Sequence, residues 1–137
     1  MVRMAKSTEV RFVVITPERC VVEDTTDFVV FTAHDGEMGI LRDRAPLMCE
    51  LGIGQFRYRS GPQTRRLFID GGFAQVCDNA VTLLTQQAMP AENITGDTIA
   101  GAEQALRSLK GTDPDTLDAR ARAQRRLSVL RRLHARM

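Results

Sequence analysis

The repeat period of the apolar residues changes at Met89-Pro90, and this change is the feature that most constrains the fold. Before it, short runs rich in β-branched and aromatic residues alternate with turn signals, as in strands that have one buried face. After it, apolar residues recur at the spacing of one helical stripe: Ile99, Ala102, Leu106 and Leu109. No helical stretch separates the strands, which argues against parallel βαβ units. We therefore expect a β-sandwich domain over residues 1–88 and a helical segment over residues 89–137.

The first segment has turn signals that divide it into about seven to ten short strands. In residues 55–59, polar residues alternate strictly with the aromatic residues Phe56 and Tyr58. Ser60-Gly61-Pro62 supplies a turn, and residues 65–70 are the expected hairpin partner. This spacing predicts an antiparallel β-sandwich. A small domain rarely leaves an aromatic strip exposed, so we expect the face with Phe56 and Tyr58 to pack on the helices or on a partner.

The second segment predicts two helices. Thr95 or Asp97 can cap the first helix, which Lys110-Gly111 ends. Asp113 is the expected cap of the second helix, with Pro114 at its first position. Five residues supply the apolar side of the second helix: Leu117, Ala121, Leu127, Leu130 and Leu133. Because only a few residues join the two helices, we expect an antiparallel hairpin that packs on the sandwich, on itself or on a partner.

The composition is that of a globular protein, with 43% hydrophobic and 26% charged residues and a net charge of only +2. No apolar run approaches the roughly 18–20 residues of a membrane span, and residues 1–7 lack the pattern of a signal peptide. We therefore expect a cytosolic protein without direct membrane insertion. Cys20, Cys49 and Cys77 lie far apart among apolar residues, and we expect them to be small buried strand residues in a reducing compartment.

The residue pattern predicts no catalytic residue, no metal site and no cofactor. His34 and His134 are the only histidines, and neither lies near a second ligand-type residue at metal spacing. His34 is expected in an exposed turn beside Asp35. Gly52-Ile53-Gly54 and Gly71-Gly72 are followed by no Lys-Ser/Thr, so tight turns or bulges between strands are expected there rather than phosphate loops.

Two short motifs resemble a known family. Residues 35–41 read Asp-Gly-Glu-Met-Gly-Ile-Leu and lead through Arg42-Asp43-Arg44 to Ala45-Pro46-Leu47, and Gly71-Gly72-Phe73 follows a strand-like run. Both resemble the epsilon subunit of F-type ATP synthases, called delta in mitochondria, with its Gly-Glu-apolar-Gly run, its His-Ala-Pro-Leu loop and its Gly-Gly-Phe. The resemblance is strong from about residue 10 to 86, and beyond that only the order of parts matches. It implies a ten-strand sandwich followed by a two-helix hairpin.

The resemblance also implies a function. Members of this family are non-catalytic rotor subunits in the central stalk of a proton-translocating ATP synthase, peripheral to the cytoplasmic face of the bacterial inner membrane. The implied partners are the gamma subunit and the c-ring. Glu37 matches the acidic position that contacts the c-ring, and Arg42, Asp43 and Arg44 occupy the adjoining loop, where the family usually has Pro-Gly-His. In residues 94–99, the Asp and the Arg of the ATP-binding motif of some relatives are both missing from their places, so no ATP binding is expected.

The C-terminal segment is strongly basic. From Pro114 to Met137 it has two aspartates, Asp115 and Asp118, and seven arginines: Arg120, Arg122, Arg125, Arg126, Arg131, Arg132 and Arg136. On the family resemblance, our hypothesis is that this arm reaches an acidic segment of the catalytic beta subunits and restrains ATP hydrolysis. The expected inhibitory contacts are Arg122, Arg125, Arg126 and Arg132.

The residues alone also allow three other interpretations of the chain. A basic helix also suits a nucleic-acid-binding module, although the sandwich lacks a strip of basic and aromatic residues to go with it. A small cupin-like enzyme would need histidine ligands that the chain does not have. Arginines on one helix can also be a plain solvated face. No nucleic-acid partner is therefore expected.

Overall fold

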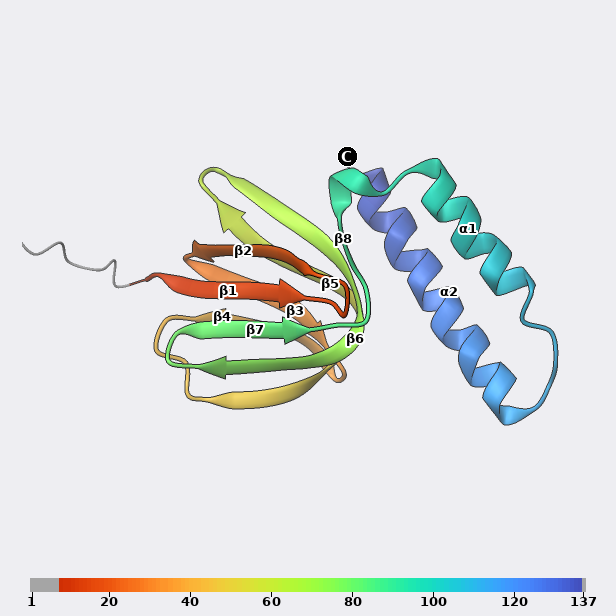
Figure 1. The fold of residues 1–137 in the computed structure, drawn as a ribbon, viewed down its shortest axis with the longest axis horizontal. Coiled ribbons are helices and arrows are strands. Elements are labelled where there is room, and N and C mark those ends of the chain that lie inside the picture. Colours follow the sequence, from red (N-terminus) through yellow and green to blue (C-terminus); the bar gives the residue numbers. More distant parts are fainter. Residues whose placement is uncertain (1–7, 137) are drawn as a thin grey trace, which may run out of the picture.

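The computed structural model describes residues 8–136, which form a β-sandwich and a helical hairpin at one end of it (Figure 1). The strands are β1 (Val10–Ile15), β2 (Cys20–Thr26), β3 (Phe28–Ala33), β4 (Gly36–Leu41), β5 (Leu47–Ser60), β6 (Gln63–Cys77), β7 (Ala80–Leu84) and β8 (Ala88–Pro90). A 3-10 turn (Ala91–Asn93) leads to the helices α1 (Gly96–Arg107) and α2 (Pro114–Ala135). This order confirms the predicted fold class, although the described residues contain eight strands rather than ten.

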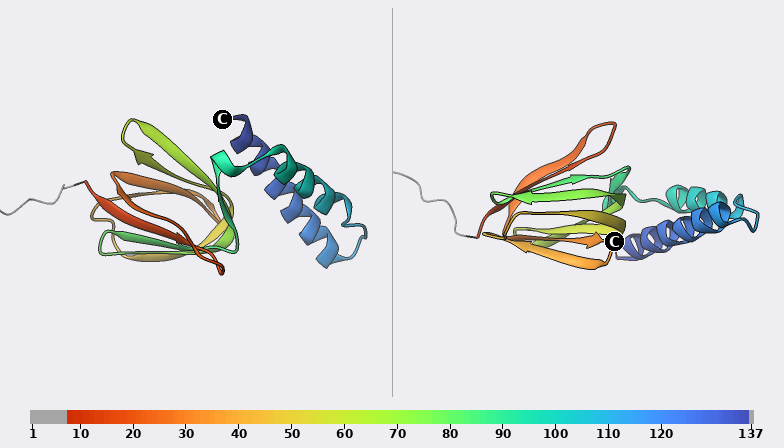
Figure 2. Two further views of the ribbon diagram at one scale, coloured as in Figure 1. Left: turned by 45° about the horizontal axis from the view of Figure 1, so that its top comes forward. Right: turned by 90° about the horizontal axis from the view of Figure 1, so that it is seen from below.

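The strands form one continuous sheet in the order β2-β1-β7-β6-β5-β3-β4, with β8 paired to β6. Neighbours are antiparallel except β1 and β7, which run parallel. The sheet folds over into two layers because the long strands β5 and β6 contribute to both, as the views of Figure 2 show. The strand count is lower than expected because the two glycine motifs lie inside these long strands and do not separate shorter ones. Gly52 and Gly54 lie in β5, and Gly71 and Gly72 lie in β6.

Two glycines allow the close strand crossing at these bends. Gly72 has φ +103°, and a Cβ atom there would lie 1.9 Å from the carbonyl oxygen of Leu84. A Cβ atom on Gly54 would lie 2.2 Å from Oγ1 of Thr32. Neither approach is possible for a residue with a side chain unless the backbone moves. The glycine motifs noted in the sequence therefore make the sandwich possible.

The aromatic core lies between the two layers. Phe12 packs against Phe56 and Tyr58 with ring centroids 5.3 Å and 4.5 Å apart, and all three side chains are buried. Burial raises the pKa of the Tyr58 hydroxyl. The strict alternation of residues 55–59 is thus confirmed as a buried and an outer face. The expectation that the Phe56 and Tyr58 face packs on the helices or on a partner is wrong, because β1 of the opposite layer covers it.

Of the two candidate caps of the first helix, Thr95 is the cap and Asp97 lies in the first turn of α1, and Asp113 caps the second helix as predicted. The Thr95 side chain accepts a hydrogen bond from the Thr98 amide, and the Asp113 side chain accepts one from the Thr116 amide. Pro114 lies in the first turn of α2, as expected. The first helix ends at Arg107, three residues before Lys110.

The hairpin docks through the C-terminal half of α2. A second apolar cluster joins it to the sandwich and consists of Phe68, Ala91, Ile94, Val129, Leu130 and Leu133. Because α2 covers β6 from outside, three consecutive residues of that strand, at positions 67–69, are all buried. The first half of α2 projects beyond the sandwich (Figure 1), so Leu117 and Ala121 are exposed, contrary to prediction. Leu127, Leu130 and Leu133 are buried as predicted.

Smaller expectations had mixed outcomes. His34 lies in the exposed β3–β4 turn, as predicted. Cys20 and Cys77 are exposed and Cys49 is only partly buried, so the expectation of buried cysteines is wrong. No helix within residues 8–136 is long and apolar enough to cross a membrane.

Candidate interaction surfaces

The charged residues from Glu37 to Arg44 do not form one loop. Residues 36–41 form β4, an edge strand of the sheet, so Glu37 lies near its start and Arg42, Asp43 and Arg44 follow its end. The predicted loop is therefore corrected to an edge strand with charges at both ends. At the start, the Glu37 carboxylate accepts a 2.8 Å hydrogen bond from the Arg57 guanidinium. At about 3.3 Å per residue, the two charged ends lie well over 10 Å apart.

The loop after β4, residues 42–46, is fixed to neighbouring elements by hydrogen bonds. Nη1 of Arg42 donates to the carbonyl oxygen of Glu9 at 3.1 Å. The Asp43 amide donates to Oδ1 of Asn79 in the β6–β7 turn. Arg44 is exposed, and the structure gives it only a backbone hydrogen bond, to Leu41. The loop thus presents the side chains of Asp43 and Arg44 to solvent from a constrained backbone.

An exposed apolar surface lies on the outer side of the layer formed by β1, β7, β6 and the start of β5. In β6, Ala74 and Val76 point into the core while Phe73 points outward. Leu84 of β7 is the direct cross-strand neighbour of both Phe73 and Ile15. We call this surface the apolar face, and its members are Val13, Ile15, Met48, Phe73 and Leu84. Phe73, Leu84 and Met48 are 56%, 54% and 68% exposed, far more than large apolar side chains usually are.

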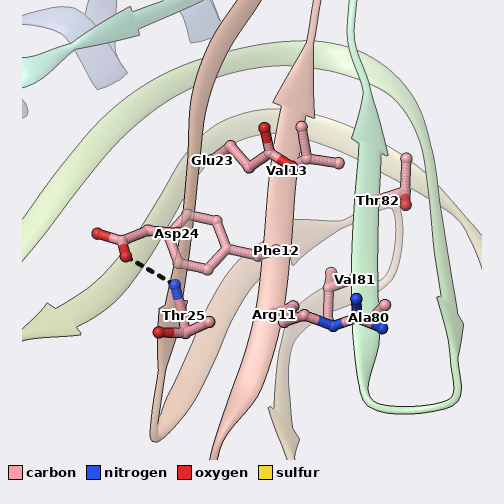
Figure 3. Close-up of a pocket in the computed structure, with 9 residues that line it drawn as sticks. All are labelled: Arg11, Phe12, Val13, Glu23, Asp24, Thr25, Ala80, Val81 and Thr82. Atoms are coloured by element: carbon pink, nitrogen blue, oxygen red, sulfur yellow. Dashed lines mark hydrogen bonds between the residues drawn. The ribbon is translucent and has the colours of Figure 1, made fainter.

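A shallow depression of about 280 Å³ continues the apolar face across β1 toward β2. Figure 3 shows its lining residues coming from β2, β1 and β7, with Phe12 near the middle and Val13 beside Glu23. Arg11 and Glu23 add charge to its rim. This combination of an apolar floor and a charged rim is typical of protein interfaces and gives no arrangement for chemistry.

The arginines of α2 are not gathered into one site. Arg126 forms a 2.8 Å ion pair with Asp70 of β6, and Arg122 pairs with Asp118 one turn earlier in the same helix. Arg125 and Arg132 are exposed and have no ion pair with another residue in the described range 8–136. Of the four predicted inhibitory contacts, two are therefore engaged within the chain in this conformation.

Sequence reasoning missed two features. The apolar face was overlooked, although residues 73–77 alternate between outer and inner positions and the sequence shows that alternation. The partner of Arg126 could not be found from the sequence, because Asp70 is 56 residues away and no local pattern links the two. Within residues 8–136, no group of three or more His, Cys, Asp or Glu residues is placed to hold a metal ion.

A family model described as "ATP synthase, Delta/Epsilon chain, beta-sandwich domain" matches residues 9–91. An ATP synthase epsilon chain of Rhodopirellula baltica is 43% identical over 88 residues, which are 64% of this chain and 69% of that one. The ATP synthase epsilon chain of Nitratidesulfovibrio vulgaris strain DP4 is 35% identical over 122 residues, 86% of this chain and 90% of that one. The second alignment extends into the helical hairpin.

Two solved structures share the fold. A chain in the Euglena gracilis mitochondrial ATP synthase (OSCP/F1/c-ring, rotational state 1) superposes with a TM-score of 0.71 at 22% identity, covering 94% of this chain and 81% of that one. A chain in the central stalk/c-ring of Tetrahymena thermophila mitochondrial ATP synthase gives a TM-score of 0.68 at 11% identity, covering 95% and 99%. At these identities, the likeness is one of fold, and it includes both the sandwich and the hairpin.

Proposed function

Because this chain belongs to the family of ATP synthase delta and epsilon chains, we propose that three of its surfaces serve three contacts of a rotor subunit. These surfaces are the apolar face, the charged ends of β4 and the helical arm. The chain is a stalk subunit of an F-type ATP synthase. In our proposal it is non-catalytic, lies at the cytoplasmic face of the inner membrane, and couples the gamma subunit to the proton-driven c-ring. The observation that best supports the proposal is that the β-sandwich, which is of this family's type, exposes the apolar face.

The apolar face is the proposed docking site for the gamma subunit. Phe73, Leu84 and Met48 leave a large apolar area in water. Burying such a side chain fully stabilises a complex by about 1.5–3 kcal/mol, so three of them supply a substantial part of a stable interface. This assignment replaces the Phe56 and Tyr58 face, which is already covered inside the sandwich.

The charged ends of β4 are the proposed contacts with the c-ring. Glu37 and Arg44 are separated by the length of the strand, so one flat contact includes both only if it runs along the free edge of β4. An exposed strand edge with charges at both ends suits the polar loops of a ring more than an apolar partner.

The arm formed by α1 and α2 is the proposed brake on ATP hydrolysis. Arg125 and Arg132 are exposed and could meet an acidic segment of the beta subunits without breaking a contact of the chain. Arg122 and Arg126 become available only when their present partners release them. A nucleic-acid-binding role is not favoured, because the direct cross-strand neighbours of the exposed aromatic side chain Phe73 are Leu84 and the acidic Glu50 rather than arginines.

Co-expression with the cognate gamma subunit tests the central contact. We expect a complex that stays intact in size-exclusion chromatography at micromolar concentration. Cys77, which lies in line with Phe73 on the outer side of β6, gives a second readout because an alkylating reagent should reach it less in the complex. The neighbouring Asp78 carboxylate raises the pKa of this thiol, so the labelling should be done at alkaline pH. Separate elution together with unchanged Cys77 labelling would refute gamma docking on this face.

A further inference from the structure

One ion pair fixes the hairpin to the sandwich. Nε of Arg126 in α2 lies 2.8 Å from Oδ2 of Asp70 in β6. Among the side-chain hydrogen bonds and ion pairs of residues 8–136, it is the one that joins α2 to a strand. The Asp70 side chain is only 14% exposed and that of Arg126 is 35% exposed, so solvent screens the pair less than it screens a surface pair.

The backbone that carries the Asp70 carboxylate is held by two hydrogen bonds. The Asp70 amide donates to the carbonyl oxygen of Gln87 and to Oγ1 of Thr85, both at 3.1 Å. These bonds tie this part of β6 to the chain segment that leads into the hairpin. A carboxylate on so constrained a backbone loses little freedom when Arg126 binds it, which favours the ion pair.

Apolar packing covers only part of the hairpin. α1 has no buried residue, and a cleft of about 240 Å³ remains between the hairpin and the sandwich. The cleft is lined by Phe68, Gln87, Met89, Thr98, Ala102, Ala105, Arg126 and Leu130. Dispersion contacts across such a gap are weak and non-directional. The directional contacts that help to define where α2 lies are the ion pair at the border of the cleft and the 3.0 Å hydrogen bond between Nδ1 of His134 and the carbonyl oxygen of Ile94.

A cluster of arginines opposes the docking of the hairpin. Arg57 and Arg66 are direct cross-strand neighbours in β5 and β6. The last turn of α2 lies beside this part of β6, because Leu133 packs in one cluster with Phe68, and Arg136 follows at the end of the helix. Nε of Arg66 is buried and has no hydrogen-bond partner among residues 8–136. Burial, followed by the charges of Arg136 and Arg57, lowers the pKa of Arg66. Glu37 pairs with Arg57, which leaves an excess of positive charge in this cluster. Holding like charges together disfavours the state that assembles them.

We infer that the docked position of the hairpin is set by these two contacts in opposition: Asp70 positions α2 through Arg126, and the cluster of Arg57, Arg66 and Arg136 weakens the docking of its last turn. A release of the arm breaks this ion pair and exposes the apolar cluster, and it relieves one repulsion, so the arginine cluster lowers the free energy that separates the docked from the released state. Asp70 is thus a positioning residue for the arm. The effect on ATP hydrolysis rests on the proposed function, whereas the effect on docking does not.

Hydrogen–deuterium exchange of the full chain tests the positioning contact. We expect Asp70→Asn to speed exchange in residues 123–133 roughly 3- to 30-fold, since the loss of a part-buried ion pair leaves Arg126 unpaired. Asp118→Asn is the matched control, because it removes the same charge from a pair that lies within α2 and does not touch the sandwich. Arg126→Gln should match Asp70→Asn, and the double variant should add little.

For the arginine cluster we expect the opposite effect on hydrogen–deuterium exchange. Arg66→Gln should slow exchange in residues 127–136, because it removes one of the like charges that the docked end of α2 meets. Arg65→Gln, at the exposed neighbouring position, is its control. Equal exchange in Asp70→Asn and Asp118→Asn would overturn the positioning role. Faster exchange in Arg66→Gln would overturn the opposing role.

The assembled ATP synthase then separates this inference from the proposed function. If the arm is a brake, Asp70→Asn and Arg66→Gln should change the hydrolysis rate in opposite directions. If exchange shifts as expected while hydrolysis stays constant in both variants, the two contacts do set the docked position, and the proposed role of the arm in hydrolysis fails.

Discussion

The backbone amide of Asp43 donates a 2.6 Å hydrogen bond to the side-chain oxygen of Asn79, which joins the loop after β4 to the β6–β7 turn. Both residues have positive φ angles, 68° for Asp43 and 61° for Asn79. Asp and Asn tolerate this conformation better than most residues do. Two turns that are 36 residues apart thereby form one constrained surface at the end of the sandwich away from the helices.

Asn79→Gly should loosen this surface without unfolding the sandwich. Glycine accepts the positive φ angle, so the turn survives, but the acceptor for the Asp43 amide is lost. We expect exchange of the Asp43 amide to rise about 2- to 10-fold, as the loss of one hydrogen bond of roughly 0.5–1.5 kcal/mol implies. Asp78→Gly is the control, because its side chain bonds only to Cys77 within the described residues. Equal exchange in the two variants would contradict the link.

Phe73→Ser or Leu84→Ser should weaken binding of the gamma subunit roughly tenfold or more. The free chain should keep its stability within about 0.5 kcal/mol, because both side chains are more than half exposed. Titration calorimetry with purified gamma subunit measures the first effect, and thermal unfolding measures the second. Leu117→Ser changes a leucine that is 47% exposed on α2, far from the apolar face, and should bind normally. A loss of binding in that control would show that a change from leucine to serine weakens the complex even away from the apolar face.

Replacing Arg44 with Glu should weaken the coupling between proton flow and ATP turnover. The residue is exposed and the structure gives its side chain no ion pair among residues 8–136, so stability should hardly change. Glu37→Gln is the companion variant at the other end of β4, and it also releases Arg57. Proton pumping in membrane vesicles that matches the unmodified enzyme in both variants would exclude the edge of β4 as the ring contact.

Removing residues 90–137 should leave assembly and ATP synthesis largely intact and should raise ATP hydrolysis. The truncation also uncovers Phe68 on the sandwich, which can cause aggregation. Alanine at Arg122, Arg125, Arg126 and Arg132 leaves the hairpin in the chain, although without the pair between Arg126 and Asp70, and should raise hydrolysis in part. Added salt should reduce the difference from the unmodified enzyme. Unchanged hydrolysis at low salt in both variants would show that the arm is not an inhibitor.

The start of α2 should lose stability only at acidic pH. The Thr116 hydroxyl and then the Thr116 amide hydrogen-bond to the Asp113 carboxylate and lower its pKa below the ordinary value of 3.8. A carboxyl group with a lowered pKa in the folded state stabilises that state above its ordinary pKa, and this contribution is lost as the pH falls through the lowered value. Carbon NMR of Asp113 should give a midpoint below 3.8, and Thr116→Val should raise it. A midpoint unaffected by Thr116→Val would disprove the assigned cause.

Gly72→Ala should destabilise the sandwich by at least about 2 kcal/mol. The added Cβ atom would meet the carbonyl oxygen of Leu84 at 1.9 Å, and the φ angle of +103° is strained for alanine. Gly101→Ala has open space in the middle of α1 and should instead stabilise the protein by about 0.5–1 kcal/mol. Denaturant unfolding of both variants measures the difference. Similar stabilities would mean that the bend in β6 adapts easily.

Features that depend on neighbouring residues in the chain were determined by the sequence alone. The alternation around Phe56 set the two faces of a strand, and Thr95 and Asp113 set where the helices begin. The change of period near Met89 separated the β domain from the hairpin. Backbone propensity, capping and side-chain periodicity act within a few residues, so a single sequence displays them directly.

Features that depend on contacts between distant residues were decided by the tertiary structure. The sequence showed that Phe56 and Phe73 lie on strand faces, and both faces have apolar residues. The packing of β1 over Phe56 places that side chain in the core, whereas Phe73 stays exposed. The glycines near Gly72 suggested strand ends, whereas the approach of Leu84 turns them into a bend inside one strand. The pairing of Arg126 with Asp70 arises because α2 folds back over β6, and the free energy of that docking comes from burial of an apolar cluster whose members are spread from residue 68 to residue 133.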